Sequence, residues 1–211
     1  MTNQANIYQI RRIAGNASVR WLAIIGFIVY FIIYFFSNTE NVPLTGRRQL
    51  VDLNLQQETV LGLQSYQQIL SQSRVVTRGQ EVDVVRVIGQ RLVAAARDLD
   101  PGYKWEFNVL DDNQANAFAL PGGKVAVYTG LFPVAENVDG LAVVMGHELA
   151  HALARHGAER IAHQKLLQAG SIAASFALGD MSYESQRLVM GAIGAGAQFG
   201  VLMPFSRKHE S

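Results

Sequence analysis

Residues 141–153 read Leu-Ala-Val-Val-Met-Gly-His-Glu-Leu-Ala-His-Ala-Leu, and most of the fold can be inferred outward from this stretch. Its apolar residues predict a helix that is buried on nearly all sides. His147 and His151 are four residues apart, so on a helix they lie about 40° apart around the axis, one turn above the other. Both imidazoles can therefore reach one metal ion, and Glu148 flanks the same face as a candidate general base.

The same five-residue pattern also arises by chance, with His and Glu on the wet face of an ordinary helix. Burying two imidazoles and a carboxylate in an apolar helix is costly unless these groups are paired or bind a metal. The apolar surroundings therefore favour a catalytic zinc site with one Zn²⁺ per chain. Because the chain contains no cysteine, disulfides and thiolate ligands are excluded, and any metal must be held by His and carboxylate.

Length and charge limit the class of protein. The chain has 211 residues, enough for one medium domain with a sizeable core plus an appendage. Its formal net charge is +1 and charged residues make up 17% of the chain, so nucleic acid is not an expected partner.

An apolar run near the N-terminus predicts a membrane anchor. Residues 21–36 are all apolar, Gly or Tyr, and a helix over 19–36 would be about 27 Å long, close to a bilayer core of about 30 Å. A cleaved signal peptide is the alternative, but no small-x-small cleavage motif follows the run. Arg11, Arg12 and Arg20 lie before this apolar run, so the N-terminus is expected in the cytoplasm and the rest of the chain outside.

Two amphipathic helices and a small sheet are predicted before the helix over 141–153 that carries His147 and His151, which we call the metal helix. Apolar residues recur at helical spacing over 55–70 and 79–99. The period changes to strict alternation over 103–109, and two short runs at 114–120 and 124–129 surround a Pro-Gly-Gly turn, which predicts a hairpin. The expected fold class is α+β: a mainly helical, zincin-like domain with a small antiparallel sheet, preceded by one transmembrane helix.

The domain organisation follows from these elements. Residues 1–18 are predicted to be a cytoplasmic tail, 19–37 a transmembrane signal anchor and 38–54 a linker, while 55–211 form the zinc domain. Asn137 and Asp139 are both candidate N-caps of the metal helix.

A segment rich in Gly and Ala follows at 170–203 and predicts a helical hairpin packed closely through small residues. Gly196 and Gly200 form a Gly-x-x-x-Gly pair within 188–205, so a second membrane helix is the alternative. Gln198 interrupts that run and favours the soluble hairpin.

A catalytic zinc site usually has three protein ligands and one open position for water. A metzincin would place a third histidine six residues after His151, where the chain has Gly157, so that arrangement is rejected. His156 is expected to point away from the ligand face on a continuous helix. The remaining candidates are three glutamates, the first of which is too near to fold back easily: Glu159, Glu184 and Glu210.

The chain resembles the membrane-linked gluzincin peptidases, which include HtpX-type proteases, CAAX prenyl endopeptidases, BepA-type proteases and the mitochondrial Oma-type protease. The resemblance covers about residue 45 to the end and is strongest to the BepA and Oma-type branch. Three motifs carry it in the same order along the chain: the hairpin from Asn116 to Tyr128, the sequence His147-Glu-Leu-Ala-His151 followed by Arg155-His156, and the segment from Ser206 to Glu210.

The resemblance implies a membrane-anchored zinc metalloendopeptidase of envelope protein quality control. Zinc would be held by His147, His151 and Glu210, with Glu148 as the general base. The partners it implies are protein or peptide substrates, especially misfolded envelope proteins, and the lipid bilayer. Together with the predicted signal anchor, the expected location is the inner membrane, spanned once, with the catalytic domain on the periplasmic side. Substrate would lie along the hairpin edge, at Asn116, Ala117, Phe118 and Ala119.

One departure from the family pattern keeps a second function open. The pattern continues after the ligand glutamate to an Ala-Asp pair whose aspartate supports a metal-binding histidine, whereas this sequence stops at Ser211. Either the sequence is a fragment or its site lacks that support, and loss of such support costs about ten- to a hundredfold in metal affinity or activity. The alternative function is a zinc-binding but inactive membrane-anchored chaperone or binding module.

Overall fold

The structure is a computed structural model that describes residues 17–42, 44, 46–177, 184, 187 and 191. The chain divides into two compact units. One contains residues 39–162, and the other contains residues 1–38 and 163–211. Glu210 and most of the hairpin predicted at 170–203 lie outside the described residues.

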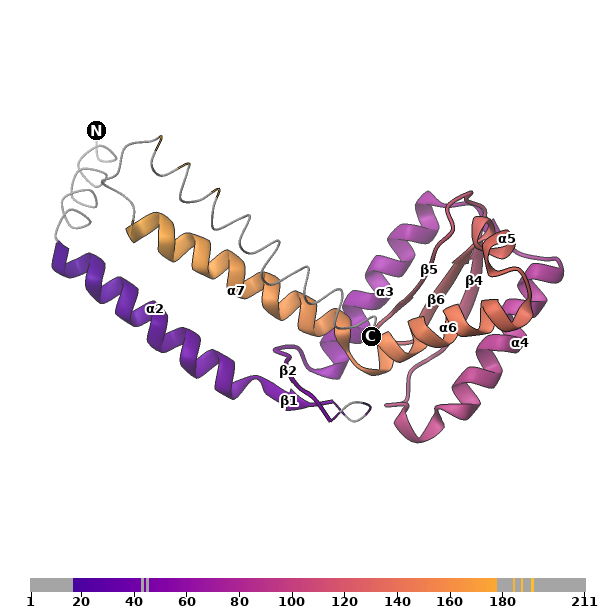
Figure 1. The fold of residues 1–211 in the computed structure, drawn as a ribbon, viewed down its shortest axis with the longest axis horizontal. Helices are drawn as coiled ribbons and strands as arrows, with labels where there is room; N and C mark the ends of the chain where they lie inside the picture. Colours follow the sequence, from indigo (N-terminus) through magenta and orange to yellow (C-terminus); the bar gives the residue numbers. More distant parts are fainter. Residues whose placement is uncertain are drawn as a thin grey trace. The chain divides into compact units, whose positions relative to one another are not determined.

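A four-stranded sheet in the order β3-β4-β6-β5 forms the centre of the unit 39–162 (Figure 1). β5 pairs antiparallel with β6, as the predicted hairpin requires, and β3 pairs antiparallel with β4. The central strands β4 and β6 are parallel, a pairing that the sequence patterns did not predict. The strands are β3 (Val75–Val76), β4 (Glu106–Leu110), β5 (Ala117–Leu120) and β6 (Lys124–Tyr128).

One helix covers the first face of this sheet. It is α3 (Leu55–Gln72), and its side chain Tyr66 packs against Leu110 and Ala126 in a buried apolar cluster. The Tyr66 hydroxyl donates a hydrogen bond to the carbonyl oxygen of Val125 at 3.0 Å. The helix predicted over 55–70 is therefore confirmed.

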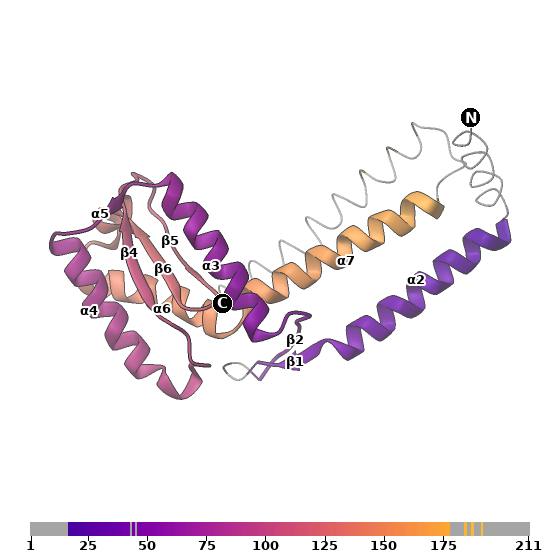
Figure 2. The same ribbon diagram turned by 180° about the vertical axis from the view of Figure 1, so that it is seen from behind.

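Two helices cover the opposite face, as the front and rear views show (Figures 1 and 2). They are α4 (Gln80–Ala95) and α6 (Val138–Leu153). Val85 and Met145 from these helices pack around Val109 in the main core cluster. The helix predicted over 79–99 is confirmed, although α4 ends at Ala95 and a 3₁₀ turn, η1 (Arg97–Leu99), follows it.

Short elements connect these layers. The predicted linker contains an antiparallel hairpin of β1 (Thr39–Asn41) and β2 (Arg48–Leu50). After the sheet, η2 (Thr129–Leu131) and α5 (Phe132–Ala135) lead into α6.

Helix α6 begins at the first of its two candidate caps. The Asn137 side chain accepts a hydrogen bond from the backbone N–H of Gly140 at 2.9 Å. The expectation that the helix is buried on nearly all sides is wrong, because Val138 is 55% and Val143 72% exposed. The face of α6 that meets the sheet and α4 is covered, whereas Val138 and Val143 lie on a side of the helix that is open to solvent.

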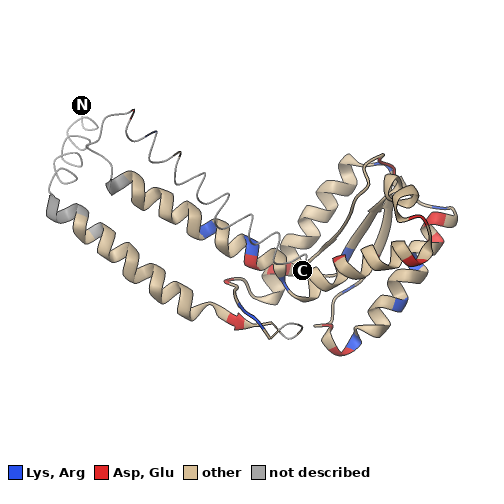
Figure 3. Cartoon of the chain, viewed as in Figure 1, with Lys and Arg blue, Asp and Glu red and all other residues tan. Residues whose placement is uncertain are grey.

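The second unit contains α2 (Ala17–Ser37) and the part of α7 (His156–Ala177) from residue 163 onward. These helices lie side by side in both views (Figures 1 and 2). No charged residue occurs in α2 from Trp21 to Ser37, and the charge-coloured view agrees (Figure 3). Most of its described large apolar side chains are exposed; Trp21, for example, is 64% exposed.

Among the described residues, no helix combines the length and the apolar character needed to cross a membrane. The membrane anchor at 19–37 and the bounds of the domains stay predictions.

Candidate metal centre

His147 and His151 meet on α6 as their spacing predicts. The Nε2 atoms of the two rings are 2.8 Å apart, and the rings are edge to face. Two nitrogens that both bind a tetrahedral zinc ion at about 2.0–2.1 Å lie about 3.3 Å apart, so a small outward movement of the rings would admit the ion. His147 is exposed and His151 is half-buried. The pair therefore fits a solvent-accessible metal.

Glu148 lies beside this pair on the same helix. Its side chain is half-buried. Burial raises the pKa of the Glu148 carboxyl, while the charge of the neighbouring His147 opposes that shift. A raised pKa suits a carboxylate that takes up a proton and releases it again near neutral pH.

The chain leaves the helical path directly after the two histidines. Helix α6 ends at Leu153, Arg155 adopts a left-handed backbone conformation with φ of 57°, and α7 begins at His156. This break turns His156 back toward the site, so that its Nδ1 lies 2.5 Å from Nδ1 of His151. The expectation that His156 points away on a continuous helix is therefore wrong.

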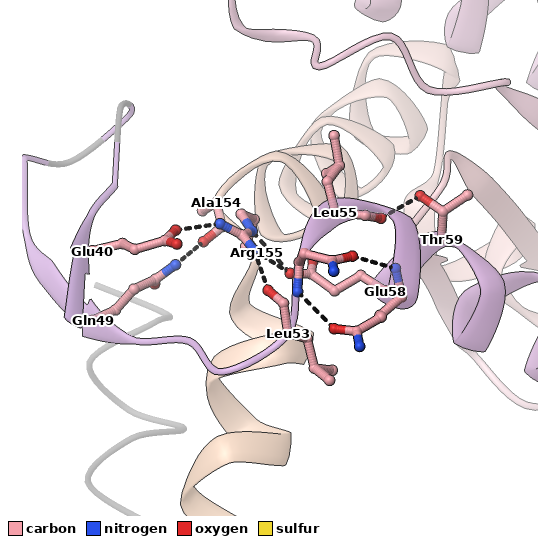
Figure 4. Close-up of polar contacts among 10 residues, drawn as sticks. Glu40, Gln49, Leu53, Leu55, Glu58, Thr59, Ala154 and Arg155 are labelled. Carbon is pink, nitrogen blue, oxygen red and sulfur yellow. Dashed lines mark hydrogen bonds and ion pairs between the residues drawn. The ribbon is translucent and has the colours of Figure 1, made fainter. Parts of the chain in front are cut away.

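Arg155 is held in this unusual conformation by partners far away in the sequence (Figure 4). Its Nε donates to Oε1 of Glu58 at 3.0 Å, and its Nη2 donates to the carbonyl oxygen of Leu53 at 2.8 Å. A further ion pair joins Arg155 to Glu40. Glu58 is only 1% exposed; burial raises the pKa of its carboxyl, and the hydrogen bond from Arg155 lowers it.

Two more contacts hold the chain on either side of Arg155. The Gln49 side chain donates a hydrogen bond to the carbonyl oxygen of Ala154 at 2.9 Å, which satisfies a carbonyl at the end of α6. Arg47 donates to both carboxylate oxygens of Glu159, at 2.9 and 2.6 Å. Glu159 is thus bound in an ion pair and does not serve as the third ligand among the three candidates.

The other predicted site residues are placed only in part. Within the part of the chain that the structure describes, no three His, Asp or Glu side chains form a complete metal cluster. Glu184 is exposed, and Glu210 lies outside the described residues, so its role as third ligand stays a prediction. Ala117, Phe118 and Ala119 lie on β5, and Asn116 directly precedes that strand.

β5 is the edge of the described sheet, paired on one side only, with β6. It also packs against α6, the helix that carries the paired histidines. An edge strand exposes backbone N–H and C=O groups to which an extended chain can bind. The predicted substrate edge and the metal helix are therefore neighbours.

Paired imidazoles and an adjacent carboxylate on a helix, beside the edge of a sheet, define the class of helix-borne His-Glu-x-x-His metallopeptidases. The chain belongs to peptidase family M48, whose family model matches residues 80–211. Membership of this family implies a metal cofactor.

The relatives of this chain include metalloendopeptidases and beta-barrel assembly-enhancing proteases. The mitochondrial metalloendopeptidase OMA1 of Schizosaccharomyces pombe is 36% identical over 183 residues, which are 85% of this chain and 51% of that protein. Human mitochondrial OMA1 is 28% identical over 70% of this chain and 29% of its own length. A putative beta-barrel assembly-enhancing protease of Vibrio cholerae is 35% identical over 58% of this chain and 25% of its own length. The chain thus spans about half the length of these relatives or less.

Sequence reasoning missed three residues of the centre. It dismissed His156, and it gave no role to Arg155 or to Glu58, which is buried within an otherwise amphipathic helix. The resemblance did include Arg155-His156 as part of a motif, which was the available signal.

Proposed function

We propose that this chain is a zinc-dependent metalloendopeptidase that hydrolyses peptide bonds. The observation that carries the proposal is the approach of the Nε2 atoms of His147 and His151 to 2.8 Å, with Glu148 on the same helix. The resemblance adds Glu210 as the third ligand. Family membership and the metalloendopeptidase relatives support the reaction class.

The chemistry divides between the ion and the protein. Zinc, when bound by His147, His151 and Glu210, supplies Lewis acidity that lowers the pKa of water toward about 7 and polarises a carbonyl. Glu148 accepts a proton from the attacking water molecule while the water oxygen adds to the scissile carbonyl carbon. The Glu148 carboxyl then passes that proton to the leaving amine nitrogen as the carbon–nitrogen bond breaks.

Substrate binding is assigned to Asn116, Ala117, Phe118 and Ala119. A peptide laid along β5 would form backbone hydrogen bonds with the strand edge, so binding would depend on an extended conformation more than on side-chain identity. An unfolded segment of a damaged protein meets that requirement, which supports misfolded envelope proteins as the substrate class. The beta-barrel assembly-enhancing proteases among the relatives agree with that class.

Membrane association is proposed through α2. What supports it is the uncharged part of the helix from Trp21 to Ser37 and its exposed apolar side chains, among them Leu22 at 68% and Phe36 at 67%. By the distribution of arginines, the N-terminus would be cytoplasmic and the catalytic unit periplasmic. Fractionation with and without α2 tests the proposal, because a chain that stays soluble with α2 present would refute it.

The test of the enzymatic function measures zinc content and casein cleavage together on the whole chain. We expect one zinc ion per chain and cleavage by the wild type. Glu148→Gln should keep the zinc but reduce kcat/KM by about 10²–10⁴-fold, because the proton acceptor is lost. Glu136→Gln, at an exposed glutamate before α6, is the matched control and should cleave normally.

Each other outcome has a definite meaning. Cleavage retained by Glu148→Gln would remove that residue from the mechanism. Zinc without cleavage in the wild type would identify the inactive binding module instead. A wild type that binds no zinc would make the motif accidental.

A further inference from the structure

His156 approaches one of the proposed zinc ligands from behind, at the ring nitrogen that faces away from His147. We propose that His156 is a positioning residue: its Nδ1 accepts a hydrogen bond from Nδ1–H of His151 and so leaves the Nε2 lone pair of His151 available for the metal. The inference rests on the proposed function, since it assigns a role relative to the zinc ligands.

Hydrogen-bond accounting leads to this assignment. A neutral imidazole has one N–H donor and one acceptor nitrogen, so of two Nδ1 atoms 2.5 Å apart one must donate and the other accept. If His156 donated, the proton of His151 would sit on Nε2, where it would block metal binding. If His151 donates, its Nε2 carries a lone pair instead of a proton, on the side that faces Nε2 of His147 at 2.8 Å.

The second arrangement is the one that metal sites require. A histidine that binds a metal through one nitrogen generally donates the other N–H to an outer acceptor, which fixes both the tautomer and the orientation of the ring. His156 offers such an acceptor. It is not itself a candidate ligand, because it contacts Nδ1 of His151, whereas the paired Nε2 atoms define the metal side.

The contact depends on the break between α6 and α7. On a continuous helix, residues five apart lie about 140° apart around the axis, and the two rings could not meet. The left-handed conformation of Arg155 redirects the chain, so that the ring of His156 meets the ring of His151. Because Arg155 is bound to the buried Glu58 and Glu159 is bound to Arg47, the chain is held on both sides of the turn and His156 is fixed before any metal binds.

Tautomers measured by ¹⁵N NMR on the metal-free whole chain, labelled at histidine and held in detergent micelles, test the inference directly. His151 is expected as the Nδ1–H tautomer in the wild type, and His156→Ala should shift it toward the Nε2–H tautomer. A structural role alone would not move this signature. A wild-type His151 that carries its proton on Nε2 would overturn the inference, and this result needs no variant to fold.

Zinc affinity provides the second measurement, by competition with a chromophoric chelator. His156→Ala should weaken zinc binding about 10–100-fold, whereas His163→Ala, a histidine farther along α7, should bind as the wild type does. Equal affinity for wild type and His156→Ala would overturn the inference. A wild type that binds no zinc would instead count against the proposed function, and the tautomer of His151 would still decide the role of His156.

Discussion

The metal helix and the turn that follows it differ in what determines their structure. Helix α6 is fixed by near neighbours: the Asn137 side chain caps Gly140, three residues on, and His147 and His151 are one turn apart. The turn at Arg155 is fixed by Glu58 and Glu40, which lie 97 and 115 residues earlier in the chain. A local pattern can therefore place the paired histidines, while the position of His156 beside them depends on remote contacts.

Among substitutions that test this difference, Arg155→Ala is expected to change the free energy of unfolding most. It removes the partner of a buried carboxylate, and an uncompensated buried charge costs about 3–5 kcal/mol of unfolding free energy. Arg160→Ala, at an exposed arginine on α7, should change stability by no more than about 0.5 kcal/mol. Urea unfolding measures both, and equal losses in the two variants would show that the remote ion pair does not hold the turn.

A second substitution at the same position isolates the backbone. Arg155→Gly loses the same side chain but adopts a positive φ without the steric cost that alanine has there, so it should be more stable than Arg155→Ala by about 1 kcal/mol. Within a continuous helix the order would be reversed, by about the same amount. The sign of the difference in urea unfolding thus reports whether the break is present in solution.

The local side of the comparison is tested at the start of α6. Asn137→Ala should cost about 1 kcal/mol, because the backbone N–H of Gly140 loses its acceptor. Asp139→Ala removes only a favourable charge in the first turn, and should cost about 0.3–1 kcal/mol. If thermal unfolding shows that Asp139→Ala is clearly the more destabilising variant, Asn137 is not the N-cap of α6.

The smallest effect is a pH dependence of stability. Burial raises the pKa of Glu159, against the lowering effect of its hydrogen bond from Arg47. The Glu159 carboxyl therefore stays protonated to higher pH in the folded chain than in the unfolded chain. Its contribution to stability is fully present below the ordinary pKa of a glutamate and is lost as pH rises through the pKa that Glu159 has in the folded chain.

Glu159→Gln removes that titration. The loss of unfolding temperature between pH 5 and pH 8 should be smaller in this variant than in the wild type, and Glu58, whose pKa is also raised, should keep part of it. If Glu159→Gln lost more unfolding temperature than the wild type over this pH range, the pKa of Glu159 would be lowered in the folded chain, not raised, which contradicts the burial argument.

Much of the fold could be predicted because periodicity reports which residues share a face. It placed α3, α4, the β5–β6 hairpin and the pair of histidines on α6. It did not report the direction of a partner strand, so the parallel pairing of β4 with β6 was not predicted. β3 has two residues, too few to show any period.

The rest of the site depended on information that is not local. A left-handed residue after a helix is usually Gly or Asn, and Arg155 gives no such signal. Its conformation follows from carboxylates that only the folded chain brings near. The exposed Val143 was mispredicted for a related reason, since composition shows that a helix is apolar but not which side lacks a neighbour.

The central claim is that His147 and His151 bind one zinc ion, and X-ray absorption at the zinc edge of the loaded whole chain tests it most directly. The account predicts two imidazole nitrogens at about 2.0–2.1 Å together with oxygen ligands, and one imidazole fewer in His151→Ala. A zinc ion without imidazole neighbours, or an unchanged count in that variant, would contradict it.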